Sequence, residues 1–196
     1  MKEFGTKFIG EELIHVVENF IDKSNRQHIQ HVLELMVDRG LMEKRGDYKY
    51  RKMRSHYSII DNYLYDYAIK ANNYIENMYE LSYQPHILDY GTFASEAGYA
   101  MEPHIDTVND YEAFNYLKYS SVIYLNDDFE GGEIVFPSIG IEYKPKAGDA
   151  IFFPSDDIKY LHGVNSIKSG NRYTLAYWHG EDGDWEKYFT NQSKNS

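Results

Sequence analysis

Three residues in the second half of the chain have the types and order of a metal-ligand set. His104 and Asp106 lie two positions apart in His104-Ile105-Asp106, and His162 follows much later. Two imidazoles and one carboxylate form the facial triad that holds non-haem Fe(II) and leaves coordination positions open for oxygen chemistry. On a strand, side chains two apart project from the same face, so His104 and Asp106 can reach one ion, with His162 supplied from elsewhere. The set predicts an Fe(II) oxygenase.

An arginine ten residues beyond the second histidine indicates what fills two of the open positions. The planar guanidinium of Arg172 can hold a carboxylate with two parallel hydrogen bonds. His162 begins a predicted hairpin that turns at Ser169-Gly170-Asn171, and Arg172 would open the returning strand and point to the same interior. This spacing indicates a dicarboxylate cosubstrate such as 2-oxoglutarate. His-x-Asp alone is a weak pattern, and only the complete set is specific.

The part of the chain that must position these residues is rich in β-strand patterns. From Pro85 onward, short apolar segments alternate with turn residues. The predicted strands cover residues 86–90, 120–125, 132–136, 150–153 and 173–178. Many short strands with such breaks are typical of a sandwich or a jelly-roll barrel.

The preceding part has helical periodicity from Glu11 to about Met78. Its three apolar stripes are Leu13, Val16, Val17, Phe20 and Ile21; Ile29, Val32, Leu33 and Met36, ending near Gly40; and Leu64, Ala68, Ala71, Ile75 and Met78, with Asp61 as a candidate N-cap. Helices followed by strands predict an α+β fold, in which residues 1–84 are mainly helical support for a catalytic core over residues 85–180. No repeat or linker divides the chain, so we expect residues 1–196 to form a single domain.

Composition narrows the partners and the location. A chain of 196 residues with 42% hydrophobic residues can bury a substantial core, and the absence of cysteine excludes disulfides and thiolate metal sites. The net charge of −11 argues against a nucleic-acid partner. No apolar run has the length of a membrane span and no signal peptide is recognisable, so we expect a cytoplasmic protein without a membrane partner.

Residues 44–54 are basic; we interpret them as a solvated segment, with a docking site for an acidic peptide as the alternative.

The segment from about Ile87 to His179 resembles the catalytic core of the prolyl 4-hydroxylase family of Fe(II)/2-oxoglutarate dioxygenases. The resemblance covers about half the chain, and the helical part matches only in general character. The matching residues, in order, are Tyr90-Gly91, His104-Ile105-Asp106, Tyr124-Leu125-Asn126, Gly131-Gly132-Glu133, Phe136-Pro137, Pro145-Lys146-Ala147-Gly148-Asp149, Phe152, His162-Gly163-Val164, Gly170-Asn171-Arg172 and Trp178.

The resemblance implies a double-stranded β-helix (jelly-roll) core with Fe(II) at one open end. Its metal ligands and catalytic residues would be His104, Asp106 and His162. It also implies 2-oxoglutarate and O2 as cosubstrates, with ascorbate as a reductant.

The resemblance further implies three residues that bind the cosubstrate. Arg172 would pair with the distal carboxylate of 2-oxoglutarate, and the hydroxyl of Tyr124 would assist it. Tyr90 would line the cosubstrate or substrate pocket, although core packing is an alternative for both tyrosines. Because the gap between Tyr90 and His104 is longer than in the family pattern, Tyr99 is an alternative for the role of Tyr90.

The activity that the resemblance implies is hydroxylation of an aliphatic C–H bond, on prolyl residues of a peptide or protein, with release of succinate and CO2. Halogenating relatives leave the carboxylate position vacant, whereas Asp106 occupies it here, so we predict hydroxylation. The alternatives are hydroxylation of free proline or another small molecule, a nucleic-acid demethylase, and a non-catalytic barrel. A demethylase of this superfamily usually carries a second arginine where this chain has Trp178. Residues 44–54 and 107–118 are the segments expected to select the substrate.

Overall fold

The structure is a computed structural model that describes residues 6–8, 13–44, 50–53, 58–106 and 116–181. Its largest element is an eight-stranded sheet with the order β1-β2-β11-β7-β14-β5-β4-β3. The bounds of these strands are β1 Thr6–Phe8, β2 His15–Val17, β3 Glu43–Lys44, β4 Tyr50–Met53, β5 His86–Ser95, β7 Leu117–Tyr124, β11 Ala150–Pro154 and β14 Arg172–Gly180.

Two smaller sheets face the large one. A four-stranded sheet has the order β10-β9-β12-β6, and β13 pairs with β8 in a two-stranded sheet. The bounds are β6 Met101–His104, β8 Glu130–Gly131, β9 Ile134–Phe136, β10 Ile141–Tyr143, β12 His162–Val164 and β13 Ile167–Ser169, with short 3-10 helices η2 at Pro137–Ile139 and η3 at Ile158–Tyr160. All strand pairs among the described residues are antiparallel. These facing antiparallel sheets confirm the predicted jelly-roll in an α+β fold.

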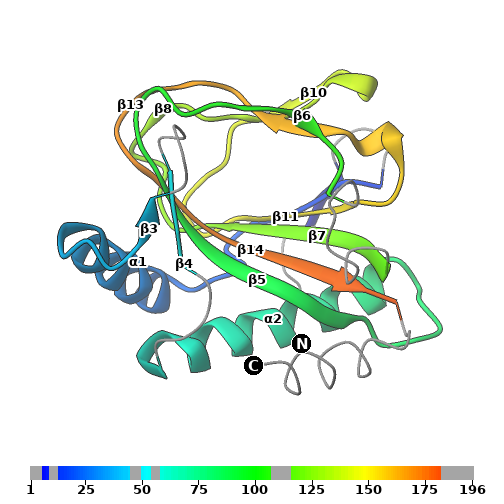
Figure 1. The fold of residues 1–196 in the computed structure, drawn as a ribbon. Helices are drawn as coiled ribbons and strands as arrows, with labels where there is room; N and C mark the ends of the chain where they lie inside the picture. The colour runs from blue at the N-terminus through cyan, green and yellow to red at the C-terminus, as the bar shows by residue number, and fades with distance from the viewer. Residues whose placement is uncertain (1–5, 9–12, 45–49, 54–57, 107–115, 182–196) are drawn as a thin grey trace, which may run out of the picture.

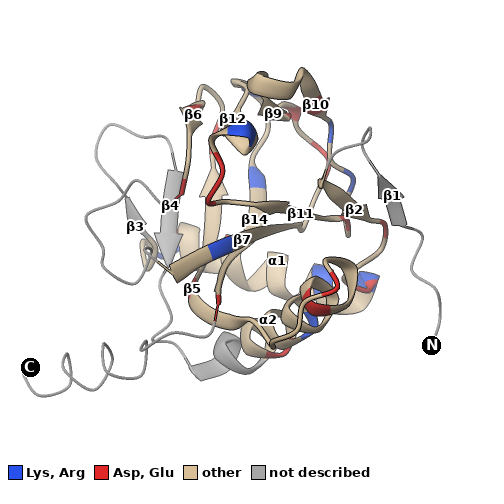
Figure 2. Cartoon of the chain, turned by 90° about the vertical axis from the view of Figure 1, so that its right-hand side faces the viewer, with Lys and Arg blue, Asp and Glu red and all other residues tan. Residues whose placement is uncertain are grey.

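Both helices lie on the face of the large sheet that is turned away from the smaller sheets (Figure 1). They are α1 (Lys23–Asp38) and α2 (Ser58–Met78). In the perpendicular view of Figure 2, strands β11, β7 and β14 separate the helices from β6, β9, β10 and β12. Within the described residues, no helix combines the length and apolar character needed to span a membrane.

Strand alternation divides the core into two parts. On β14, Tyr173, Leu175 and Tyr177 pack toward the helices in one buried cluster with residues such as Leu33 and Ile75. A second cluster, which includes Tyr124 and Phe136, fills part of the space between the sheets. Since successive side chains of a strand point to opposite faces, Arg172, Thr174, Ala176 and Trp178 of β14 face the interior between the sheets.

The helix predicted over Leu13–Ile21 is wrong, because His15–Val17 forms β2 in the large sheet. β2 pairs with β1 and with β11. Val16 belongs to the cluster between the sheets, and Val17 belongs to the cluster beneath the helices. A strand that is buried on both faces is apolar at consecutive positions, and a short run of this kind cannot be distinguished from a helical stripe by periodicity.

The other two stripes form helices, with one difference in a boundary. The side chain of Asp22 accepts a hydrogen bond from the backbone N–H of Asn25 and so caps α1, which ends just before Gly40 (φ 67°). The helix α2 begins at Ser58, so Asp61 lies inside the helix and is not its N-cap. Strands β1 to β4 show that residues 1–84 also extend the large sheet and are not only a helical support.

Candidate metal centre

The three predicted ligands meet at one end of the space between the sheets. His104 is the last residue of β6, His162 is the first residue of β12, and the two are register partners. Asp106 follows His104 by two positions, just after β6 ends. Its Oδ1 lies 3.3 Å from Nε2 of His104, and its Oδ2 lies 3.8 Å from Nε2 of His162. One ligand atom from each residue lies within 4.8 Å of the others, so one ion can bind all three.

Glycine allows the strands that carry the two histidines to approach each other closely. A Cβ atom on Gly163 would lie 2.6 Å from the carbonyl oxygen of Met101 and 3.1 Å from the nitrogen of Pro103. The first of these distances is shorter than real Cβ atoms show, so β12 can lie this close to β6 only with glycine at position 163. This approach places His162 opposite His104.

Main-chain acceptors orient both imidazole rings. Nδ1 of His104 lies 3.0 Å from the carbonyl oxygen of Glu102, and Nδ1 of His162 lies 3.3 Å from that of Tyr160. A carbonyl can only accept, so each Nδ1 donates its proton and each Nε2 keeps its lone pair toward the ion. Both rings are therefore held in the tautomer that a metal requires.

The pKa shifts of two of the three ligands, Asp106 and His162, also suit a divalent cation. Burial raises the pKa of Asp106, but its contacts with His104, His162 and Ser120 outweigh burial and bring that pKa down to about 2. Burial lowers the pKa of His162. For His104 burial acts in the same direction, but its contacts with Asp106 and with the Glu102 carbonyl raise its pKa overall. At neutral pH the site therefore offers an ionised carboxylate and a neutral His162.

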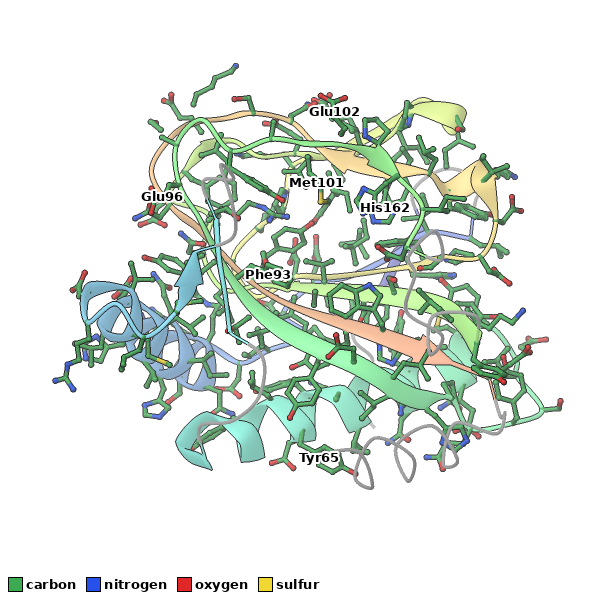
Figure 3. The ribbon with its side chains drawn as sticks, viewed as in Figure 1. Tyr65, Phe93, Glu96, Met101, Glu102 and His162 are labelled. Atoms are coloured by element: carbon green, nitrogen blue, oxygen red, sulfur yellow. The ribbon has the colours of Figure 1, made fainter. Side chains whose placement is uncertain are left out.

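A cavity of about 540 Å³ opens over the triad. In Figure 3, Phe93 lies on the large sheet, and Met101 and His162 lie on the opposite layer. The wall beyond the metal ligands is largely apolar, formed by Phe93, Tyr99, Met101, Val164 and Trp178. The cavity has room for an organic cosubstrate together with part of a second ligand.

Arg172 and Tyr124 form a buried polar pair beside the triad. The guanidinium carbon of Arg172 lies 5.1 Å from the centre of the Tyr124 ring, and Arg172 lines the cavity while remaining 5% exposed. Among the described residues, Nε of Arg172 and the hydroxyl of Tyr124 have no hydrogen-bond partner. Burial raises the pKa of Tyr124, so its hydroxyl remains a donor at neutral pH. A buried cation next to an unused donor fits the distal carboxylate of 2-oxoglutarate.

The structure contradicts the placement of Tyr90 in the pocket. Tyr90 pairs with Tyr177 across β5 and β14, and their rings stack at 6.2 Å beneath the large sheet. It packs against the cluster under the helices, whereas Phe93 and Ser95 lie on the cavity face of β5. Side chains of a strand whose positions differ by an odd number point to opposite faces, so Tyr90 points away from the cavity face that Phe93 and Ser95 occupy. Tyr99, the alternative, does line the cavity.

The predicted hairpin between His162 and Arg172 is also absent. His162 belongs to β12 in the four-stranded sheet, and Arg172 begins β14 in the large sheet, next to β5 and β7. The segment between them crosses from one sheet to the other through β13. The two residues still face the same cavity, but from opposite walls.

Three residues near the site carry contacts that we did not predict. Ser120 donates a hydrogen bond to Asp106, Ser155 donates one to Ser120, and Asn126 contacts the backbone on both sides of Arg172. Polar residues in strands that are otherwise apolar, such as Ser120, are the available signal in the sequence. Most of the basic segment 44–54 and residues 107–115 of the segment 107–118 lie outside the described residues.

Comparison with known proteins agrees with this geometry. Residues 85–180 match the family model of the 2OG-Fe(II) oxygenase superfamily. Human prolyl 3-hydroxylase 2 is 38% identical over 71 residues, which are 34% of this chain and 10% of that protein. The chain therefore matches only a small part of the length of this curated relative.

Solved structures share the fold over most of the chain. A collagen prolyl hydroxylase from Paramecium bursaria Chlorella virus-1, in a 2OG complex, has a TM-score of 0.68 and 17% identity, covering 90% of this chain and 100% of that one. A prolyl-4-hydroxylase from Pseudomonas putida has a TM-score of 0.67 and 18% identity, covering 89% and 96%. With the matched core, the triad and the cavity considered together, the chain belongs to the 2OG-Fe(II) oxygenase superfamily.

Proposed function

We propose that this protein is an Fe(II)- and 2-oxoglutarate-dependent dioxygenase that hydroxylates prolyl residues of a peptide or protein. The observation that carries the proposal is one cavity that joins the His104–Asp106–His162 triad to the buried Arg172. A triad alone would fit several metals and reactions. A buried guanidinium beside it adds a specific reason to bind a dicarboxylate.

Bound Fe(II) would couple the oxidative decarboxylation of 2-oxoglutarate by O2, which yields succinate and CO2, to insertion of one oxygen atom into a substrate C–H bond. The residues of the chain bind and orient. Arg172 and Tyr124 hold the distal carboxylate and thereby direct the opposite end of the cosubstrate toward the triad. His104, Asp106 and His162 would hold the ion and leave coordination positions for ligands that are not protein. Because Asp106 fills the carboxylate position, the expected product is an alcohol.

The wall of the cavity supports an apolar target such as a prolyl ring. Phe93 and Trp178 contact each other edge to face at 6.4 Å, and Met101 lies on the same cavity. Such a wall can desolvate an aliphatic ring and exclude water next to the metal. The related collagen prolyl hydroxylase and prolyl-4-hydroxylase folds support a peptide or protein substrate.

The test is succinate formation from 2-oxoglutarate, with and without Fe(II), in the presence of proline-rich peptides, free proline or buffer alone. The proposal predicts iron-dependent turnover that a peptide increases, together with a mass gain of one oxygen atom on proline. Turnover increased by free proline and by no peptide would instead support the small-molecule hydroxylase. No turnover in protein shown to bind iron would support a non-catalytic barrel.

Two variants test whether the triad is responsible for that turnover. We expect His162→Ala to abolish iron-dependent succinate formation, because the ion loses one of its three ligands. His31→Ala is the matched control, since His31 is an exposed histidine on α1 whose contact is with Glu34. Full turnover in His162→Ala would contradict its role as a ligand.

A further inference from the structure

A chain of two serine hydroxyls ends on the carboxylate of Asp106. Oγ of Ser155 donates to Oγ of Ser120 at 2.6 Å, and Oγ of Ser120 donates to Oδ2 of Asp106, also at 2.6 Å. All three residues are buried. Because the Ser155 proton already occupies a lone pair of the Ser120 oxygen, the Ser120 proton is directed to the carboxylate.

The chain of hydroxyls joins the two layers of the jelly-roll at the metal site. Asp106 follows β6 of the four-stranded sheet, whereas Ser120 lies in β7 and Ser155 follows β11, two adjacent strands of the large sheet. Asp106 itself lies outside regular secondary structure, so its side chain is not oriented by a strand. The contact with Ser120 supplies that orientation from the opposite layer.

Ser155 is itself held in place from the surface. Its backbone N–H donates to the carbonyl oxygen of Lys118 at 2.8 Å. The ammonium of Lys118 pairs with Oδ2 of Asp156 at 2.9 Å and lies 3.5 Å from Oε1 of Glu181. These contacts connect the start of β7 with the residues that follow β11 and β14, and the backbone hydrogen bond holds Ser155 next to β7.

We propose that Ser120 and Ser155 are positioning residues that hold Asp106 as a ligand through one oxygen. This inference rests on the Fe(II) site of the proposed function and adds the residues that orient it. Ser120 engages Oδ2, so Oδ1, which is 3.3 Å from Nε2 of His104, is the oxygen left for the ion. A carboxylate that binds through one oxygen keeps the remaining coordination positions available for a cosubstrate that binds through two atoms.

Metal binding without any turnover tests this inference. The dissociation constant of Co(II), and the visible absorption spectrum of the bound ion, would be measured in the full chain without 2-oxoglutarate or substrate. We expect Ser120→Ala to weaken binding by about 10- to 100-fold and to change the spectrum, because the carboxylate can rotate or bind through both oxygens. Ser120→Thr, which keeps a hydroxyl, should retain both properties, and Ser155→Ala should weaken binding less than Ser120→Ala.

Ser121→Ala is the matched control. Ser121 is the next residue of β7 and is equally buried, but its hydroxyl contacts Nε2 of His179 at 2.9 Å on the helix side of the sheet. Its loss should lower stability and leave Co(II) affinity unchanged. Equal loss of affinity in both alanine variants, or an unchanged constant and spectrum in Ser120→Ala, would overturn the proposal.

A second variant covers the case in which Ser120→Ala does not fold, as judged by circular dichroism. Ser155→Ala then decides alone: weaker Co(II) binding supports the positioning role of the two serines, and unchanged binding overturns it. The outcome is also separate from that of the proposed function, since the serine variants are compared by metal binding and the function by succinate formation.

Discussion

Tyr124 carries a buried hydroxyl next to the charged guanidinium of Arg172. It is fully buried, it contacts the guanidinium of Arg172 through its ring, and its oxygen has no hydrogen-bond partner among the described residues. An unused buried donor costs about 1 to 3 kcal/mol, and because this one lies beside Arg172, a carboxylate bound by the guanidinium would satisfy it. This interpretation makes Tyr124 part of the carboxylate site and not of the core alone.

We therefore predict that Tyr124→Phe raises the KM for 2-oxoglutarate by about 10-fold, because it removes one hydrogen bond to a charged carboxylate. Succinate formation at varied 2-oxoglutarate would measure this. Tyr177→Phe is the control, since the Tyr177 hydroxyl is also buried without a described partner but lies on the helix side of β14. An equal KM in Tyr124→Phe and the native protein would return Tyr124 to a packing role.

His179 is a buried residue that makes the stability of the fold depend on pH. It is fully buried between Oδ1 of Asn72 (2.6 Å) and Oγ of Ser121 (2.9 Å), and burial lowers its pKa to about 3. In the unfolded chain the pKa of His179 would be about 6.5, so the unfolded state takes up the proton at a higher pH than the folded state does. The stability that neutral His179 contributes is thus fully present above about pH 6.5 and is lost as the pH falls toward 3.

We predict that the free energy of unfolding of the metal-free protein decreases by about 1.4 kcal/mol per pH unit below about pH 6 through this one group. Urea unfolding at about pH 7.5 and about pH 5.5 would measure the decrease. His179→Gln should show a smaller decrease between the two pH values, even if it is less stable at both. The same decrease in both proteins would contradict the assignment to His179.

At the scale of elements, one side chain fixes the start of β14. Asn126, just after β7, donates from Nδ2 to the carbonyl oxygen of Asn171 at 2.7 Å and accepts at Oδ1 from the backbone N–H of Tyr173 at 2.8 Å. These are the two neighbours of Arg172. The amide therefore holds the backbone on both sides of the predicted carboxylate anchor, and it is itself buried.

We predict that Asn126→Ala raises the KM for 2-oxoglutarate by about 10-fold or more, because Arg172 loses its fixed position. The Co(II) dissociation constant should stay near its native value, because Asn126 contacts none of the three ligands in the contacts that the structure describes. Asn77→Ala, which removes an exposed amide on α2, is the control. A parallel loss of metal affinity in Asn126→Ala would indicate a general disruption of the fold.

At the scale of the whole molecule, the core beneath the large sheet is shared between the two parts of the sequence. The cluster includes Phe20, Leu33 and Ile75 from the first part, and Phe152 and Leu175 from the second. β2 also pairs with β11, so the first part completes the sheet as well as covering it. The helices that cover the large sheet therefore come from the first part of the chain, and residues 85–180 supply only the strands beneath them.

We predict that residues 85–196 alone do not fold cooperatively, because removal of residues 1–84 exposes the apolar face of the large sheet. Urea unfolding followed by circular dichroism would test this against the full chain. A cooperative transition in the shorter chain would show that residues 85–180 form an independent domain.

The sequence alone determined the chemistry and the class of fold. The residue types and spacing of His104, Asp106 and His162 predicted the metal ligands, and Arg172 predicted the carboxylate partner. Short apolar strands between turn residues predicted the jelly-roll. These features are local, since they depend on residue type and on spacing along the chain.

The tertiary structure alone decided which face and which sheet each residue occupies. A shift of one residue moves a strand side chain to the opposite face, which placed Tyr90 beneath the sheet and Phe93 in the cavity. The pairing of β2 with β11, and the contact of Ser120 with Asp106 from the other layer, join positions far apart in sequence. Such contacts depend on packing between layers, and the periodicity of a single segment carries no information about its partner.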